Sequence, residues 1–198
     1  MMKDYNEVIL TGQVISGYKY IYSTNIDSYY IMTVKSTRVS GKVDYIPVMI
    51  SGELIFRRKL KGQFVKIEGY YSSFNKKNRL YQYVRVQKIE TENERYVDIN
   101  SIRIKGTINQ QPKFRKTALT NIDITDLFLR VNEPDISYFP AIAWGRYASI
   151  SSRFQIGDSV ELHGRIQSRE YYKKIDQESG FKRRICEISI IHIEKSNQ

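Results

Sequence analysis

Aromatic rings and cationic groups are the chemically distinctive side chains of this sequence of 198 residues. It contains 16 tyrosines, eight phenylalanines and one tryptophan, and its 32 lysines and arginines outnumber 21 acidic residues, giving a net charge of +11. Rings provide platforms on which unpaired bases stack, and cations attract phosphates. The composition therefore favours single-stranded over duplex nucleic acid as a partner, although tyrosines also pack on strand faces and basic residues also solvate a surface.

The sequence lacks the residue patterns of common catalytic and metal sites. It contains no GxxxxGK, HExxH or GxSxG segment and no carboxylate cluster with the spacing of a two-metal nuclease site. One cysteine, Cys186, and two histidines, His163 and His192, supply neither an intramolecular disulfide nor a zinc site. We therefore expect no enzymatic activity, no cofactor and no bound metal.

The hydropathy pattern predicts neither a membrane span nor a secretory leader. No apolar segment approaches the roughly 20 residues of a transmembrane helix. The N-terminal residues MMKDYNEVILTGQV lack a long apolar core followed by a cleavage site of small residues. We expect a cytoplasmic protein without a membrane partner.

An internal repeat divides the sequence into two similar halves. Residues 8–14 (VILTGQV) resemble residues 102–108 (IRIKGTI), and further matches follow in the same order. The landmarks recur at a spacing of 93 to 95 positions: Gly12 and Gly106, Pro47 and Pro140, Gly52 and Gly145, Gly62 and Gly157, Gly69 and Gly164. We expect two copies of one unit, as domains at residues 1–92 and 93–198 with a polar linker at residues 90–95.

Each copy alternates apolar and polar residues over short stretches bounded by glycines and polar turns, which is typical of β-strands. The predicted strands are residues 7–15, 29–37, 45–51, 64–73 and 80–89, then 101–108, 126–131, 138–144, 159–171 and 183–194. Helical segments at residues 52–61 and 145–154 end at Gly62 and Gly157, and Gly69 and Gly164 fall where a long fourth strand must coil. Five strands with a helix after the third is the plan of the OB-fold, so we expect an all-β protein of two tandem five-stranded Greek-key barrels.

Three segments of the second copy resemble the bacterial single-stranded DNA-binding proteins. They are residues 138–145 (YFPAIAWG), 156–158 (IGD) and 164–171 (GRIQSREY), similar to that family's third strand, helix exit and fourth strand. Residues 8–12, 44–48 and 61–69 are similar to the same elements, without the strand-four arginines. The resemblance implies a tandem OB-fold form that binds single-stranded DNA without sequence preference, protecting it in DNA replication, recombination or repair.

In that family, aromatic residues of the binding face stack on bases. By position, the resemblance places Tyr138, Trp144 and Tyr171 of the second copy, and Tyr45 of the first, at stacking positions. Ser51 stands where the second copy has Trp144. The nearby rings that could compensate in the first copy are Tyr70, Tyr71 and Phe74.

The hairpin between the last two strands of each copy is rich in cations and rings. The first contributes Lys76, Lys77 and Arg79; the longer second one contributes Tyr171, Tyr172, Lys173, Lys174, Lys182, Arg183 and Arg184. Arg165 and Arg169, in the preceding strand, complete the candidate DNA-binding residues. We expect the second hairpin to act as a mobile finger that closes over a bound strand, with an ordered surface loop or a dimer contact as the alternatives.

A third group of rings follows the first strand, where Tyr18, Tyr20 and Tyr22 alternate along the chain. Alternate residues of a strand point to the same side, so we expect these rings on one strand face. There they either stack bases or pack at a barrel lip or at the seam between the domains.

The resemblance also implies partners other than DNA. A homodimer would supply four barrels in total. The sequence ends in residues 193–198 (IEKSNQ), without the acidic tail by which family members recruit replication and repair proteins, so we do not expect recruitment by that route. Two alternatives stay open: an accessory protein of replication restart or conjugation that acts with a helicase, and an RNA-binding module, because ring stacking does not read the sugar.

Overall fold

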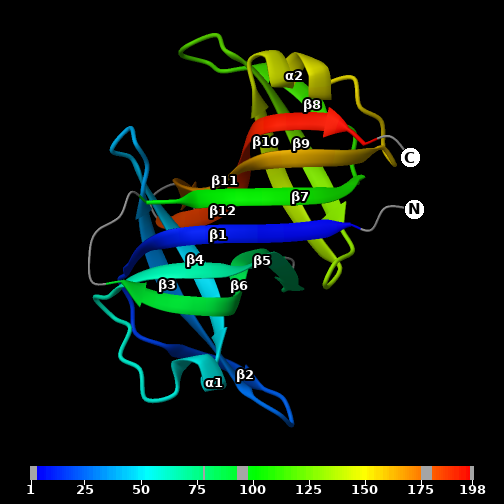
Figure 1. The fold of residues 1–198 in the computed structure, drawn as a ribbon. Helices are drawn as coiled ribbons and strands as arrows, with labels where there is room; N and C mark the ends of the chain where they lie inside the picture. The colour runs from blue at the N-terminus through cyan, green and yellow to red at the C-terminus, as the bar shows by residue number, and fades with distance from the viewer. Residues whose placement is uncertain (1–3, 78, 93–97, 175–179, 197–198) are drawn as a thin grey trace.

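The computed structural model describes residues 4–77, 79–92, 98–174 and 180–196, with the backbone alone for residues 172–174 and 180–182. The first half contains β1 (Tyr5–Val14), β2 (Lys19–Ser23), β3 (Ser28–Thr37), β4 (Val43–Ser51), β5 (Phe64–Lys76) and β6 (Arg79–Glu92). The second half contains β7 (Asn100–Ile108), β8 (Lys113–Lys116), β9 (Asp123–Val131), β10 (Ser137–Trp144), β11 (Ser159–Lys174) and β12 (Gly180–Lys195). Two short helices, α1 (Gly52–Ile55) and α2 (Arg146–Ser151), follow β4 and β10, and the all-β class is confirmed (Figure 1).

In the first half, β1, β3, β4, β6 and β5 close into a barrel. Strand β1 pairs antiparallel with β3 and β5, β4 pairs with β3, β6 pairs with β5, and a short parallel contact between Val48 and Val84 joins β4 to β6. The apolar residues of the alternating pattern, such as Leu10 and Ile46, are fully buried inside. Closure gives every strand in the ring a paired strand on each side and leaves the interior to be filled by side chains.

The second half repeats this arrangement with β7, β9, β10, β12 and β11. The pairing partners correspond strand for strand, including the parallel contact, which here joins Ala141 to Ile188. The internal repeat of the sequence therefore corresponds to two barrels of one topology. The prediction of two tandem OB-type barrels is confirmed.

The helices are shorter than the predicted segments. Helix α1 has a single turn, and the Ser51 hydroxyl at its N-cap accepts a hydrogen bond from the backbone N–H of Leu54. Gly62 and Gly157 adopt φ of +88° and +93° before the chain enters β5 and β11, but the helices end at Ile55 and Ser151, so the prediction that these glycines cap them is wrong. No helix among the described residues has the length and apolar character needed to cross a membrane.

Two short strands were not predicted, β2 and β8, and each forms a hairpin with the strand that follows it. In the first hairpin a register shift sets Tyr20 opposite Tyr30 and Tyr22 opposite Tyr29. Tyr29 and Tyr30 are adjacent in β3 and point to opposite sides, so Tyr20 and Tyr22 do as well. The prediction of one shared face for these rings is wrong, because the bulge breaks the alternation.

The predicted linker is partly strand. Residues 90–92 belong to β6, where Glu90 lies opposite Lys66 and Glu92 lies opposite Phe64. Residues 93–97 lie outside the described residues, so a domain boundary at residue 92 stays a prediction.

The long fourth strand of each barrel shifts register at a glycine, at Gly69 in β5 and at Gly164 in β11. A Cβ on Gly69 would overlap the carbonyl oxygen of Arg85, and one on Gly164 would lie 2.5 Å from that of Ser189. Both obstacles are backbone atoms of the neighbouring strand, so they move only if the ladder moves. Close approach of two strands therefore requires glycine at both bends.

We expect Gly69→Ala to destabilise the protein by about 1–3 kcal/mol, the usual cost of forcing an extra carbon into a packed site. Urea unfolding followed by circular dichroism measures the loss. The matched control is Gly17→Ala, because no atom of the described residues lies within 4 Å of a Cβ built there. Equal stability of the two variants would contradict this account of the bend.

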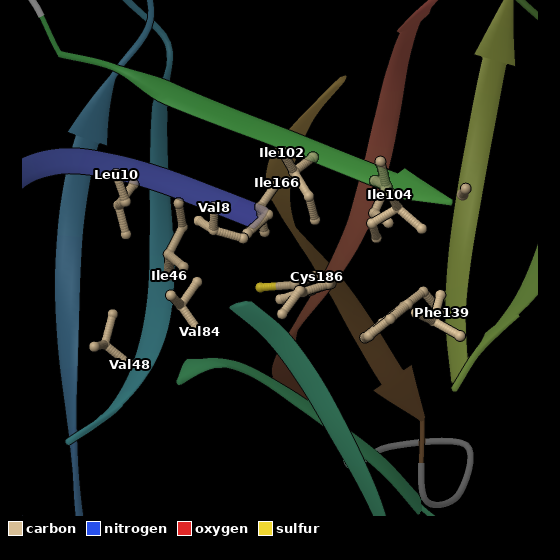
Figure 2. Close-up of a cluster of buried hydrophobic side chains, with 14 of the residues drawn as sticks. Val8, Leu10, Ile46, Val48, Val84, Ile102, Ile104, Phe139, Ile166 and Cys186 are labelled. Atoms are coloured by element: carbon tan, nitrogen blue, oxygen red, sulfur yellow. The ribbon is translucent and has the colours of Figure 1, made fainter. Parts of the chain in front are cut away.

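An antiparallel ladder between β1 and β7 joins the two barrels. It runs from Tyr5 opposite Lys105 to Leu10 opposite Asn100, and the two strands lie side by side at the centre of the molecule (Figure 1). The buried side chains of the two barrels form one continuous cluster, in which Val8 and Ile46 of the first approach Ile166 and Cys186 of the second (Figure 2). Each fully buried side chain of this kind contributes about 1.5–3 kcal/mol.

Equivalent serines hold the barrels together on either side of this ladder. The backbone N–H of Tyr45 in β4 donates to Ser168 Oγ in β11 at 2.9 Å. The backbone N–H of Tyr138 in β10 donates to Ser73 Oγ in β5 at 2.8 Å. In the first contact the first barrel supplies the donor and the second the acceptor, and in the second contact these roles are reversed. The two barrels therefore contact each other through equivalent residues of the repeat.

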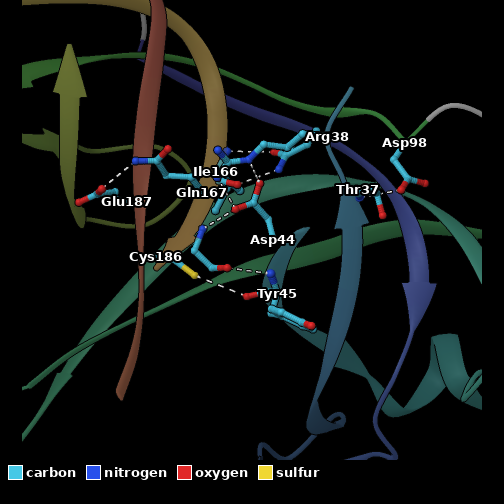
Figure 3. Close-up of polar contacts among 11 residues, drawn as sticks. Thr37, Arg38, Asp44, Tyr45, Asp98, Ile166, Gln167, Cys186 and Glu187 are labelled. Carbon is cyan, nitrogen blue, oxygen red and sulfur yellow. Dashed lines mark hydrogen bonds and ion pairs between the residues drawn. The ribbon is translucent and has the colours of Figure 1, made fainter. Parts of the chain in front are cut away.

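The contact surface between the two barrels, here called the seam, also holds a buried ion pair on one side. Arg38 Nε and Nη2 donate to the two carboxylate oxygens of Asp44 at 2.6 and 2.7 Å, and the backbone N–H of Ser168 donates to Asp44 Oδ1 (Figure 3). The Asp44 side chain is 0% exposed. Three hydrogen bonds compensate for burial of this carboxylate at the contact between β4 and β11.

We expect Asp44→Ala to destabilise the protein by about 3 kcal/mol, because it leaves the Arg38 guanidinium and the Ser168 N–H without their acceptor. Urea unfolding measures the change. Asp126→Ala is the control: Asp126 makes a bidentate contact with Arg115 at 2.6 and 3.0 Å, but these side chains are 41% and 52% exposed. Removing that pair is expected to cost below about 1 kcal/mol, and comparable losses for both variants would rule out burial as the deciding factor.

Candidate nucleic-acid interface

Rings line the outward face of the first barrel. The ladder between β5 and β6 pairs Tyr70 with Arg85 and Phe74 with Tyr81, with Tyr83 between them on the same side. Alternate residues of a strand point to opposite sides, so these side chains lie on the outward side, where Tyr83 is covered by its neighbours, while Tyr71 and Val84 between them fill the core. We call Tyr29, Tyr70, Phe74, Tyr81, Tyr83 and Arg85 the first face.

A stacked pair of rings lies at one end of the first face. The Phe74 and Tyr81 rings are 5.1 Å apart and nearly parallel, at 9°. Arg79 Cζ lies 4.7 Å from the centre of the Tyr81 ring. Phe74 is 37% exposed and Tyr81 is 36% exposed, so the stack presents a surface to which an unpaired base could add.

Arg85 organises the middle of the first face. Its Cζ lies 3.8 Å above the Tyr29 ring, and its Nη1 donates to the Tyr22 hydroxyl at 3.1 Å. Because β2 carries Tyr22, the hairpin of β2 and β3 brings another ring to this surface. The Arg85 guanidinium thus interacts with the Tyr29 ring and with the Tyr22 hydroxyl.

Tyr70, between Arg85 and the second barrel, remains neutral at physiological pH. Burial, together with the nearby Asp135 carboxylate, raises its pKa to about 12. Its hydroxyl donates to Asp135 Oδ2 at 3.4 Å across the seam. Burial likewise raises the pKa of Tyr83.

The corresponding surface of the second barrel is a cationic groove of about 720 Å³. Trp144 lies in it and is 38% exposed. Its basic lining residues are Arg38, Lys42, Arg115, Arg165 and Arg169. We call this hollow the second face; an indole ring beside several cations suits both parts of a nucleotide, the base and the phosphate.

Three of these cations have carboxylate partners. Arg38 pairs with Asp44, Arg115 with Asp126, and Arg169 with Glu187, at 2.6, 2.6 and 3.4 Å. Glu187 also accepts a hydrogen bond from Gln167 Nε2 at 2.8 Å (Figure 3). The carboxylates reduce the charge of the groove and hold these side chains in place.

Arg165 and Lys42 differ, because neither makes an ion pair within the described part of the chain. Arg165 Nε is buried and has no hydrogen-bond partner among those residues. Burial and the neighbouring Arg38 cation lower the pKa of Arg165, although a guanidinium stays charged at neutral pH. Lys42 is exposed on the loop between β3 and β4. The uncompensated charge of the second face comes from these two residues.

Tyr71 is not available for stacking. It is 0% exposed, and its ring stacks on Phe139 at 4.7 Å inside the core between the barrels. Burial raises the pKa of its hydroxyl well above the ordinary value. The prediction that Tyr71 contacts DNA is wrong for this structure, because Tyr71 alternates with Tyr70 and points inward.

Tyr45 and Tyr138, at equivalent positions in β4 and β10, are half-buried by neighbouring side chains. Arg184 Cζ lies 4.0 Å above the Tyr45 ring, and its Nη2 donates to Glu170 Oε1 at 2.6 Å. The Tyr138 ring stacks on Phe128 at 6.0 Å. Arg184 is thus engaged at the seam, and stacking of bases on these two tyrosines stays a prediction.

The hairpins carry the remaining predicted residues. Lys76 and Lys77 are exposed at the tip of the first, and Tyr171 lies opposite Arg183 in the ladder of the second. The side chains of Tyr172, Lys173, Lys174 and Lys182 lie outside the described residues. A finger that closes over DNA stays a prediction.

Sequence reasoning missed several residues of both faces. Tyr81, Tyr83 and Arg85 alternate along a predicted strand, and pairing them across the hairpin with Tyr70 and Phe74 could have identified them. Arg115 lies in the unpredicted strand β8. Nothing in the sequence indicates Arg38 and Lys42, because they belong to the first barrel and line the groove of the second.

The binding groups of the two faces are rings and cations, which are not the usual ligands of metal ions. Within the described residues, no group of three or more histidine, cysteine, aspartate or glutamate side chains is placed to hold a metal ion. The Cys186 thiol is buried at the seam, and burial raises its pKa to about 12.

Comparisons with known proteins support the fold. No family model and no curated protein matches the sequence. The wild-type single-stranded DNA-binding protein of Thermus aquaticus aligns over 100% of this chain and 95% of its own, with a TM-score of 0.78 and 20% identity. A deletion variant of that protein aligns equally well, at 21% identity over 97% of its length. The N-terminal domain of PriB from Thermoanaerobacter tencongensis aligns over 45% of this chain, with a TM-score of 0.42 and 29% identity. The chain thus shares its full-length fold with the Thermus aquaticus protein, and the resemblance to the tandem OB-fold form is confirmed at the level of the fold.

Proposed function

We propose that this protein binds single-stranded DNA without strong sequence preference and protects it during replication, recombination or repair. The observation that carries the proposal is the presence, on each barrel, of an outward surface where exposed rings lie beside cations. The fold shared with a protein named for binding single-stranded DNA supports it.

The chemistry of the two faces accounts for weak sequence preference. Every base has a flat face, so Trp144 and the stack of Phe74 and Tyr81 accept any base, at about 1–3 kcal/mol for each one stacked. Guanidinium and ammonium groups bind phosphates, which are the same along the strand. Binding by these contacts makes or breaks no covalent bond, so we propose a binding role without catalysis.

Affinity for a labelled oligothymidine is expected to fall steeply as the salt concentration rises, because lysine and arginine side chains that bind phosphates release counterions from the strand. Fluorescence anisotropy at several salt concentrations measures this slope. An affinity that does not change with salt, or no binding at low salt, would overturn the proposal. Competition by an oligouridine of equal length tests the preference for DNA over RNA.

The fluorescence of Trp144 is expected to fall on binding, because it is the sole tryptophan and a stacked base quenches an indole. Trp144→Ala is expected to weaken binding by about 1–3 kcal/mol. Ile191→Ala is the matched control, since Ile191 lines the same groove and is exposed, yet offers no ring. Unchanged fluorescence and affinity would remove Trp144 from the site.

We also propose that two chains associate, so that a homodimer presents four barrels. Multi-angle light scattering is expected to give twice the 23.4 kDa mass of one chain. The same measurement during titration with oligothymidines of increasing length gives the number of nucleotides covered per dimer. A mass of one chain at all working concentrations would contradict the dimer without affecting the DNA-binding proposal.

A further inference from the structure

Each barrel sends one loop across the seam to the face of the other. The loop between β3 and β4 of the first barrel places Arg38 and Lys42 in the groove of the second, beside Arg165 and Arg169. The loop between β9 and β10 of the second places Asp135 against Tyr70 of the first. Both loops reach the opposite barrel because β4 and β10, which follow them, are hydrogen-bonded across the seam to Ser168 and Ser73.

The two crossing loops carry opposite charges. Residues 38–42 read RVSGK and contain two cations, whereas residues 132–136 read NEPDI and contain two carboxylates. Because Asp44 pairs with Arg38, the second face gains the positive charge of Lys42 from its neighbour, and the first face gains negative charge. Since the loops occupy equivalent positions in the repeat, the difference separates the two faces electrostatically.

The outward positions of the barrels differ in the same sense. The shared spacing of the repeat places Tyr70 at the position of Arg165, and strand register places Phe74 at the position of Arg169. Rings thus replace guanidiniums at equivalent points of β5 and β11. The guanidinium of the first face, on Arg85, lies over Tyr29, and that of Arg79 beside the face lies over Tyr81.

Acidic side chains also edge the far end of the first face. A hollow of about 630 Å³ beside Tyr29 and Arg85 is lined by Asp27 and Glu53. The corresponding hollow of the second barrel contains Trp144, where the first has Ser51. Carboxylates beside Tyr29, from Asp27 and Glu53, and beside Tyr70, from Asp135, disfavour a phosphate at these two places of the first face.

The second face has the opposite character, because its charge is incompletely paired. Arg165 Nε is buried without a hydrogen-bond partner among the described residues, and Lys42 makes no ion pair among them. A buried donor without an acceptor is costly, and an anionic oxygen in the groove would satisfy it. The non-bridging oxygens of a phosphodiester are anionic acceptors of this kind, whereas the flat face of a base offers none.

We propose that the two barrels divide the recognition of one strand: the second face supplies the phosphate contacts beside the base stacked on Trp144, with Lys42 of the first barrel completing it across the seam, while the first face contributes base stacking. The proposal rests on the proposed function, since it assigns parts of single-strand binding to the two barrels. Salt dependence distinguishes the contributions, because only phosphate contacts release counterions.

The test compares the slope of log affinity against log salt for an oligothymidine across variants of the full chain. Lys42→Gln is expected to reduce the magnitude of the slope by about 0.7, the value for one lost phosphate contact on a single strand. Lys61→Gln, an equal change of charge at an exposed lysine outside both grooves, is expected to keep the wild-type slope. Tyr81→Ala is expected to weaken binding about tenfold at every salt concentration without changing the slope.

The outcomes separate this proposal from the one on which it rests. If the wild-type protein does not bind at low salt, both fail. If it binds and Lys42→Gln keeps the wild-type slope, or Lys61→Gln lowers it equally, the crossing loop has no specific part and the division is wrong. A lower slope for Tyr81→Ala would also overturn the division. Circular dichroism melting of each variant confirms that these exposed substitutions leave the fold intact.

Discussion

The antiparallel ladder of β1 and β7 is the contact on which the rest of the structure depends. It fuses the cores of two barrels, so that Val8 and Ile166 belong to one buried cluster. Hydrogen bonds between strands fix register as well as distance. Because the ladder is antiparallel, each barrel meets its neighbour with the same elements, and the serine contacts at Ser73 and Ser168 recur on both sides. The orientation of both binding surfaces follows from this one pairing.

A seam built in this way gives each copy access to the surface of the other. The loop before β4 reaches the second barrel, and the loop before β10 reaches the first, because the strands that follow them pack across the seam. Asp44 and Ser137 occupy equivalent positions at the start of those strands, yet only Asp44 holds an arginine. Packing thus constrains the backbone of the repeat while leaving charge at the loops free to differ. That freedom allows two barrels of one topology to present different chemistry.

Burial decides the role of chemically similar side chains. Tyr70 and Tyr71 are adjacent, but one faces outward beside Asp135 and the other stacks on Phe139 in the core. Arg38 and Arg115 both make bidentate contacts whose shorter distance is 2.6 Å, but only the contact at Arg38 is shielded from water. In both comparisons the residue type is the same and the surroundings differ. The position of a side chain in the barrel therefore determines whether it is available to a ligand or engaged in packing.

The sequence by itself determined the repeat, the two barrels, the glycines at the bends and a basic, ring-rich composition, because these depend on local alternation and on spacing along the chain. It also located Trp144, Arg165 and Arg169, which lie together in one groove. Only the tertiary structure decided that Tyr71 is buried, that Tyr20 and Tyr22 point apart, and that Lys42 lies at the second barrel. The physical reason is that a bulge, a shared core and a seam bring together residues far apart in the chain, and local patterns carry no record of such pairings.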